Sequence, residues 1–204
     1  MLASRWLSGA MGLVLAAGAA EADSRAVTAL DPALPLPGAT FDEARAMALA
    51  PGQRMICDTD SDKPALEQPR ILEAQPGRGP VRVRRCSVFA DTGKGGWGLS
   101  PVVTLAGPAR LWLVFVEQGL GGRFRLAQLR LAAGRDHWDR AATALGETLG
   151  PGAVGGSRYV SWQDSQHETL MFVDDKYPSE FKIVIDDLRL RRLLRSPGAM
   201  PNID

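Results

Sequence analysis

Three aspartates, Asp58, Asp60 and Asp62, alternate with polar residues in one short segment. Alternate acidic side chains are typical of the start of a calcium-binding loop, because Ca²⁺ prefers carboxylate oxygens. The segment departs from that pattern, since Lys63 stands where such a loop needs a glycine and Pro69 stands where a glutamate would close the cage. We interpret it as a solvated acidic loop, with calcium binding as the alternative.

The remaining reactive side chains form no recognisable catalytic pattern. Gly93 and Lys94 lie in a glycine-rich loop, but Gly95 stands where a phosphate-binding loop has Ser or Thr. His137 and His167 have no second His or Cys at metal-ligand spacing. The chain also lacks a Gly-x-Ser-x-Gly nucleophile elbow. We therefore expect no catalytic residue, metal or cofactor, and an enzyme is the weaker hypothesis.

Aromatic side chains are the stronger candidates for binding. Trp97 and Lys94 lie in a glycine-rich insertion, and Trp112 and Trp162 lie in apolar, strand-like segments. Tryptophan often contributes most of the binding free energy at protein interfaces. Core packing is the alternative, above all for Trp112, which lies within a six-residue apolar run. We name Trp97, Trp112, Trp162 and Lys94 as the candidate contact residues.

The elements that position these residues are clearest in residues 110–150. An apolar strand at 111–116 and a second strand at 124–131 flank glycines, and a helix follows at 136–149. Asp136 is the expected cap of the helix, and Gly150 ends it. The apolar face of the helix has members at helical spacing: Trp138, Ala141, Ala142, Leu145 and Leu149.

The same pattern of helix followed by strands occurs earlier in the chain. After an extended lead-in at residues 23–39, Thr40 and Glu43 form a capping box that starts a short helix. Three segments then align on later ones, namely 52–60 on 156–164, 88–91 on 171–174, and 108–115 on 178–185. The sequence predicts an α+β fold of two tandem α-β-β-β units, an antiparallel sheet with helices packed on one face.

The two units have different lengths, because the first carries two loop insertions. The first unit covers residues 40–131, and its insertions cover about 59–80 and 92–107. The second unit covers residues 132–204 and includes a C-terminal turn. Insertions on one copy of a duplicated scaffold indicate where a specialised surface would lie.

The internal alignment also predicts how the two cysteines pair. Cys57 aligns on Ser161 and Cys86 aligns on Thr169, and these partners are symmetric about a hairpin centred on Ser165. Directly opposed residues on antiparallel strands are close enough for a disulfide. We expect a structural Cys57–Cys86 disulfide.

Charge and the N-terminal residues limit the classes of function. A net charge of +1 over 204 residues gives no general attraction to nucleic acid. Residues 1–22 have the pattern of a signal peptide, with Arg5 before a short apolar run and small residues at the cleavage site. The run is too short for a membrane span, and no cysteine follows it. We expect an exported protein, periplasmic or secreted, with no stable membrane span after cleavage.

Two tandem units of this element order over residues 40–190, with a cysteine pair bridging strands, resemble the tandem-repeat fold of the β-lactamase-inhibitory proteins. A single unit is similar to the BamE-like outer-membrane assembly lipoproteins. The resemblance implies that the chain binds proteins through an exposed sheet face and loops. We expect an interaction module whose partner is an envelope or extracellular protein. The alternative is a small-ligand binder or hydrolase with its site between the two units.

Overall fold

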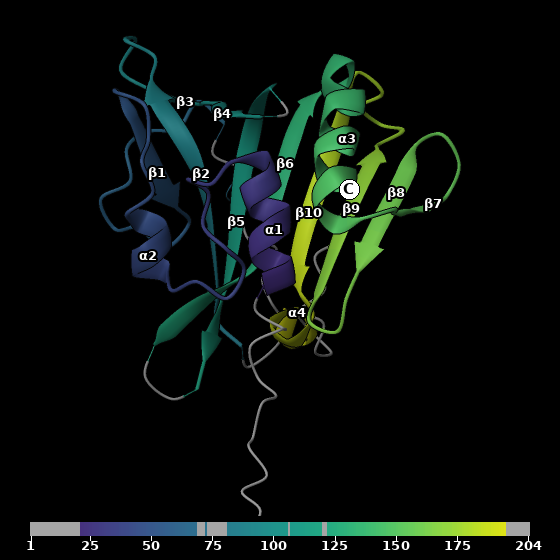
Figure 1. Cartoon of the computed structure of the whole chain (residues 1–204). Coiled ribbons are helices and arrows are strands. Elements are labelled where there is room, and N and C mark those ends of the chain that lie inside the picture. The colour runs from purple at the N-terminus through teal and green to yellow at the C-terminus, as the bar shows by residue number, and fades with distance from the viewer. Residues whose placement is uncertain (1–20, 69–71, 73–80, 106, 120–121, 195–204) are drawn as a thin grey trace, which may run out of the picture.

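The computed structural model describes residues 21–68, 72, 81–105, 107–119 and 122–194. Within them, ten strands form one antiparallel sheet in the order β1-β2-β5-β6-β10-β9-β8-β7, with β3 beside β2 and β4 beside β5 (Figure 1). The strands are β1 (Gln53–Cys57), β2 (Val83–Asp91), β3 (Trp97–Leu99), β4 (Val102–Thr104), β5 (Gly107–Gln118), β6 (Arg123–Gly134), β7 (Ala153–Val154), β8 (Tyr159–Gln163), β9 (His167–Val173) and β10 (Glu180–Asp187).

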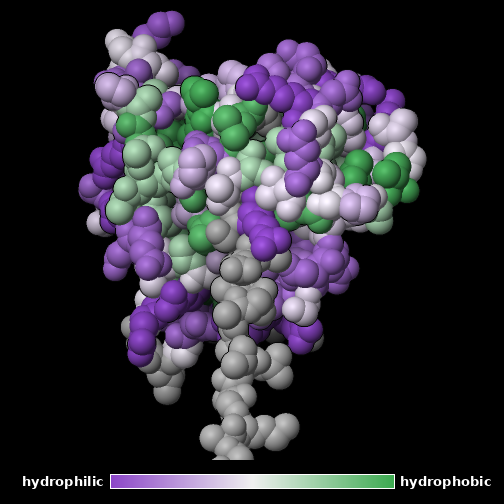
Figure 2. Space-filling view, viewed as in Figure 1, coloured by the Kyte–Doolittle hydropathy of each residue, from purple (hydrophilic) through white to green (hydrophobic). Residues whose placement is uncertain are grey.

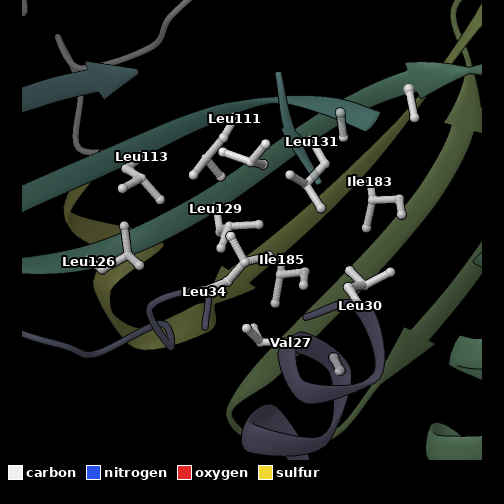
Figure 3. Close-up of a cluster of buried hydrophobic side chains, with 14 of the residues drawn as sticks. Val27, Leu30, Leu34, Leu111, Leu113, Leu126, Leu129, Leu131, Ile183 and Ile185 are labelled. Carbon is white, nitrogen blue, oxygen red and sulfur yellow. The ribbon is translucent and has the colours of Figure 1, made fainter. Parts of the chain in front are cut away.

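Helices cover one face of this sheet. The helices are α1 (Glu21–Leu30), α2 (Phe41–Arg45), α3 (Trp138–Leu149) and α4 (Leu188–Leu194), with a 3-10 turn at Arg135–His137. Apolar side chains of α1, α2 and α3 share one core with alternate residues of the central strands, as Figure 3 shows for α1 and the central strands. The expected sheet-rich antiparallel fold is confirmed, but α4 is an exception among the helices, because it packs on the opposite face.

The first helix replaces part of the expected lead-in. Residues 23–39 were expected to be extended, whereas α1 occupies Glu21–Leu30 and only the segment after it is irregular. Ala26, Val27 and Leu30 have helical spacing and are buried against the sheet and α3. The helix also includes the last two residues assigned to the signal peptide; the rest of that peptide lies outside the described residues.

Of the four signals that start and end α2 and α3, two are confirmed and two are wrong. The first helix was expected to end at Pro51 and Gly52, but α2 ends at Arg45 with Ala46 as its C-cap. The capping box of α2 is confirmed, with the Thr40 N–H donating to Glu43 Oε2 at 2.6 Å and the Glu43 N–H donating to Thr40 Oγ1 at 3.2 Å. Gly150 ends α3 with φ 86°. Asp136 does not cap α3, because residues 135–137 form the 3-10 turn and the N-cap is His137, which makes no side-chain capping bond.

The apolar face predicted for the longer helix is confirmed. Ala141 and Leu145 are fully buried, and Trp138, Ala142 and Leu149 pack against the same core. The Trp138 ring stands edge-on to Phe181 of β10, with ring centroids 5.5 Å apart. This contact fixes α3 over the half of the sheet that β8, β9 and β10 form.

The two halves of the sheet are arranged as mirror images. β1, β2 and β5 follow one another from one edge toward the centre, and β8, β9 and β10 do so from the other edge. β5 and β10 are parallel, because each is antiparallel to β6. A rotation that superposes one half on the other would therefore turn the sheet over and put α2 and α3 on opposite faces. They share a face, so the repeated element order does not correspond to two units related by rotation.

The Cys57–Cys86 disulfide is confirmed. The two cysteines are directly opposed in the β1–β2 register, with their Cα atoms 4.0 Å apart. The hairpin used to predict the pairing has a different register, because Thr169 lies opposite Trp162 and not Ser161. The alignment of β1 on β8 is therefore one residue out of phase.

An arginine stacked between two phenylalanines fixes α2 on the sheet. The guanidinium carbon of Arg84 lies 4.1 Å from the ring centroid of Phe41 in α2 and 4.6 Å from that of Phe124 in β6. The Phe41 ring in turn stands edge-on to Phe115, which is fully buried. A desolvated cation–π contact contributes up to about 2 kcal/mol.

Replacement of Arg84 by alanine is expected to lower the free energy of unfolding by about 1–2 kcal/mol, since it removes both ring contacts. Urea denaturation followed by circular dichroism measures this change. Arg123→Ala is the matched control, because Arg123 is exposed next to Phe124 on β6 and its loss should change stability by no more than about 0.5 kcal/mol. Equal effects of the two replacements would contradict a structural role for the stack.

Candidate functional site

The sheet face opposite α1, α2 and α3 is covered only at its ends by the described residues. At one end, Leu66, Leu72 and Trp97 pack over Ile56 and Phe89. Elsewhere on this face, Leu190 and Leu194 of α4 pack over Val114 and Val116 of β5 and Ala127 of β6. The middle of this face, across β5, β6, β10, β9 and β8, carries neither cover.

Two adjacent rows of side chains cross this middle region. In one row Trp112 lies opposite Arg130, Arg130 opposite Val184, and Val184 opposite Leu170. In the next row Arg110 lies opposite Ala132, Ala132 opposite Lys182, Lys182 opposite Phe172, and Phe172 opposite Tyr159. We call the half-buried or exposed members of these rows the open face: Arg110, Trp112, Arg130, Tyr159, Leu170, Phe172 and Lys182.

Two of the three charged side chains of the open face, Arg110 and Lys182, form ion pairs. Arg110 forms an ion pair with Glu180 and lies over the Trp112 ring, 5.6 Å from its centroid. Lys182 forms an ion pair with Asp174. The side chains in these pairs are 22–39% exposed, and ion pairs in contact with water contribute little to stability. They are therefore free to exchange partners when another surface approaches.

A buried hydrogen-bonded network lies beside the open face, under α4. Arg130 donates through Nε to Gln128 Oε1, and Gln128 donates through Nε2 to Asp186 Oδ1 at 2.6 Å. Arg191 of α4 donates to Asp186 Oδ2 at 2.9 Å and also pairs with Glu168. The network joins α4 to β6, β9 and β10. Sequence reasoning missed it, although Gln128 and Arg130 alternate with leucines in β6.

Burial determines the ionisation of this network. The pKa of Asp186 is raised, chiefly because burial disfavours the charged carboxylate, and Arg191, Gln128 and Arg130 act in the opposite direction. The pKa of Arg130 is lowered, again chiefly by burial. Groups with shifted pKa values gather at functional sites and also in structural ion-pair networks, and here every partner is internal.

A pH-dependent effect on stability follows from Asp186. Its pKa is higher in the folded than in the unfolded protein, so its contribution to the free energy of unfolding falls as pH rises from about 4 through the folded-state pKa. The free energy of unfolding of the wild type, minus that of Asp186→Asn, is therefore expected to fall between about pH 4 and pH 7. Urea titrations of both proteins across this range measure it. A difference that rises with pH would show that ion pairing, and not burial, dominates at Asp186.

The four predicted contact residues lie in different environments. Trp112 alone belongs to the open face. Trp97 is half-buried and packs against the cluster of Ile56 and Phe89. Trp162 is 8% exposed on the helix-covered side, where its Nε1 donates to the Gly150 carbonyl at 2.9 Å. Lys94 is exposed in the turn before β3. The structure therefore does not bring the four together as one surface.

Each aspartate of the acidic loop has a different partner within the chain. Asp58 accepts the Arg85 N–H at 3.0 Å, Asp60 accepts the Cys57 N–H at 2.9 Å, and Asp62 pairs with Arg54 at 2.8 Å. Among the residues that the structure describes, no three His, Cys, Asp or Glu side chains are placed to hold a metal ion. Each carboxylate is therefore engaged by its own backbone or arginine partner, and the three do not converge on one point.

The described residues form a disulfide-bonded antiparallel sheet with helices, and they cover one of its faces only in part. None of the helices described here is both long and apolar enough to cross a membrane. Comparisons with family models, curated proteins and solved structures give no match for this chain.

Proposed function

We propose that this protein is an exported interaction module that recognises a protein partner through the open face. The observation that supports the proposal is the set of apolar side chains that are not fully buried in the two rows of the open face, on a sheet whose other face is covered: Trp112, Leu170, Phe172 and Tyr159. Aromatic anchors surrounded by exchangeable charges are the usual composition of a protein interface.

The edges of the sheet are poor alternatives to its face. At β1, the Cys57 N–H donates to Asp60 Oδ2 at 2.9 Å, and the Cys57 carbonyl accepts the Asp60 N–H at 3.3 Å. At the opposite edge, β7 has only two residues. Short edges with internally bonded groups resist the addition of a further strand. A partner is therefore expected to contact side chains and not to extend the sheet.

The disulfide favours an oxidising compartment for this interaction. Disulfides form and persist in secreted and periplasmic proteins. Together with the apolar N-terminal sequence at 1–22, the disulfide supports the proposal that the partner is an envelope or extracellular protein. The insertion at 92–107, which contains Lys94 and Trp97, is proposed as a secondary contact at the border of the open face.

Point variants test the proposal directly. Trp112→Ala and Phe172→Ala are each expected to weaken partner binding by about 30-fold, the effect of losing an interface anchor worth about 2 kcal/mol. Val154→Ala is the matched control, because Val154 is a 71% exposed apolar residue of the edge strand β7. Affinity capture from the natural host, followed by titration with the purified partner, gives the constants. Equal affinity of all three variants would contradict binding through the open face.

The alternative of a small-ligand binder or hydrolase with a site between two units has less support. In the part of the chain that the structure describes, the strands of the two expected units are joined through β6 into one sheet, so they do not form two separate sheets with a site between them. Asp58 and Asp60, the acidic candidates for such a site, bind groups of their own chain.

A further inference from the structure

A pocket lies on the helix-covered side of the molecule, between α2 and the segment that follows α1. Its volume is about 580 Å³, within the usual range for small-molecule sites. One wall is formed by residues 33–39, and the other by Met47 and its neighbours on α2 and just after it. In the space-filling view, hydrophobic residues are visible between the positions of α2 and α1 (Figure 2). The open face and its network do not contribute to this pocket.

The lining is apolar except for two charged residues, Glu43 and Arg125. Leu34, Pro35 and Pro37 are buried, which fixes the wall, whereas Leu36 is 38% exposed. The wall is also held by the sheet, because the Gly38 N–H donates to the Leu126 carbonyl at 2.7 Å. A preformed apolar pocket with few polar groups is the usual form of a small-ligand site.

The two charged residues differ in the partners that they already have. Glu43 Oε2 accepts the Thr40 N–H at 2.6 Å and the Thr40 hydroxyl at 2.8 Å, as part of the capping box. Arg125 donates through Nη1 to the Gly38 carbonyl at 3.0 Å, and among the described residues it forms no ion pair with a carboxylate. Its hydrogen bond to Gly38 is thus to a neutral acceptor. The pKa of the Glu43 carboxyl is lowered chiefly by its hydrogen bonds from Thr40 and to a smaller extent by the charge of Arg125. Further N–H groups of the guanidinium are left for a ligand.

We propose that this pocket binds an amphipathic carboxylate, with the apolar part against Leu36 and Met47 and the carboxylate on Arg125. A guanidinium binds a carboxylate through two parallel hydrogen bonds, which a neutral polar group does not match. The ligand is either a free aliphatic acid or the C-terminus of an apolar peptide, since both present the same chemistry. The proposal is independent of partner binding at the open face.

Isothermal titration and amide chemical-shift mapping with octanoate test the proposal on the intact protein. Octanoate is expected to bind and to shift the amides of Gly38, Ala39 and Met47, and octanol is expected to bind at least about 10-fold more weakly. A short apolar peptide with a free C-terminus, compared with its amidated form, distinguishes a peptide ligand from a free acid. Equal binding of octanoate and octanol, or shifts that do not map to the pocket, would overturn the proposal.

Point variants test separately whether the guanidinium recognises the carboxylate and whether the pocket holds the apolar part of the ligand. Arg125→Gln, which keeps a donor for the Gly38 carbonyl, is expected to weaken octanoate binding about 10-fold or more and to leave octanol unchanged. Arg123→Gln is the matched control, because Arg123 is exposed on the same strand and does not line the pocket. Ala46→Phe, at an exposed lining position, should fill the pocket and abolish binding of both probes. Unchanged octanoate affinity in Arg125→Gln would refute the role of the guanidinium.

Discussion

Replacement of Cys57 and Cys86 by serine is expected to lower the free energy of unfolding by about 3.5 kcal/mol. The disulfide joins residues that are 29 positions apart, and that closed loop contains the first insertion. Without the bond the unfolded chain regains the conformational freedom of the whole loop. Urea denaturation of the double variant and of the wild type, both under oxidising conditions, measures the difference.

A reductant provides the control for this prediction. Dithiothreitol should lower the unfolding midpoint of the wild type toward that of the Cys57→Ser/Cys86→Ser variant, and it should leave the variant unchanged. Identical midpoints of the oxidised wild type and the variant would show that the first insertion is held by its side-chain contacts alone, chiefly those of Leu66 and Leu72 with Phe89.

Replacement of Arg191 by alanine is expected to lower the free energy of unfolding by about 3 kcal/mol at pH 7. Arg191 is the cation that pairs with both Asp186 and Glu168, and the Asp186 side chain is only 3% exposed. Its removal leaves two carboxylates side by side with no bound cation, one of them buried. Calorimetry or urea denaturation gives the change.

A double-mutant cycle distinguishes this charge effect from loss of helix packing. In an Asp186→Asn background, Arg191→Ala should cost at least about 1 kcal/mol less than in the wild type, because the buried charge is already gone. Arg189→Ala is the control on the exposed side of α4 and should be nearly neutral. Strict additivity of the Asp186 and Arg191 replacements would mean that the network contributes through packing only.

Local signals in the sequence predicted much of the fold. The capping box at Thr40 and Glu43, the glycine at the end of α3, and the apolar face of that helix act over a few residues, so they are readable without knowledge of the partners. The cysteine pairing was also predicted correctly, although the hairpin that suggested it has another register.

The one-residue error in aligning β1 on β8 has a physical cause. An alternating pattern fixes which face of a strand is buried only when the other face is polar. In β1, Met55 and Cys57 enter the main core, whereas Ile56 is buried on the opposite side under the first insertion. Each face of β1 therefore carries a buried apolar side chain, and the sequence alone does not show which face belongs to the main core.

The open face and its network depend on contacts between distant segments. Gln128 lies 58 positions before Asp186 in the chain, and neither their pairing nor the path of α4 onto the opposite face follows from periodicity. Trp162 was ranked with Trp112 because both lie in apolar strands, and only the register places them on opposite faces of the sheet. The helix α1 was missed because its short apolar pattern precedes a proline-rich segment.

Site-specific photocrosslinking tests most directly whether the open face is the binding surface. A photoreactive phenylalanine analogue would be placed at Phe172 on the open face and, in a second protein, at the exposed Arg140 on the outer side of α3. Both proteins would be produced in the natural host and irradiated. The account predicts one discrete adduct with an envelope or extracellular protein from position 172 and none from position 140. The same adduct from position 140, with none from position 172, would contradict it.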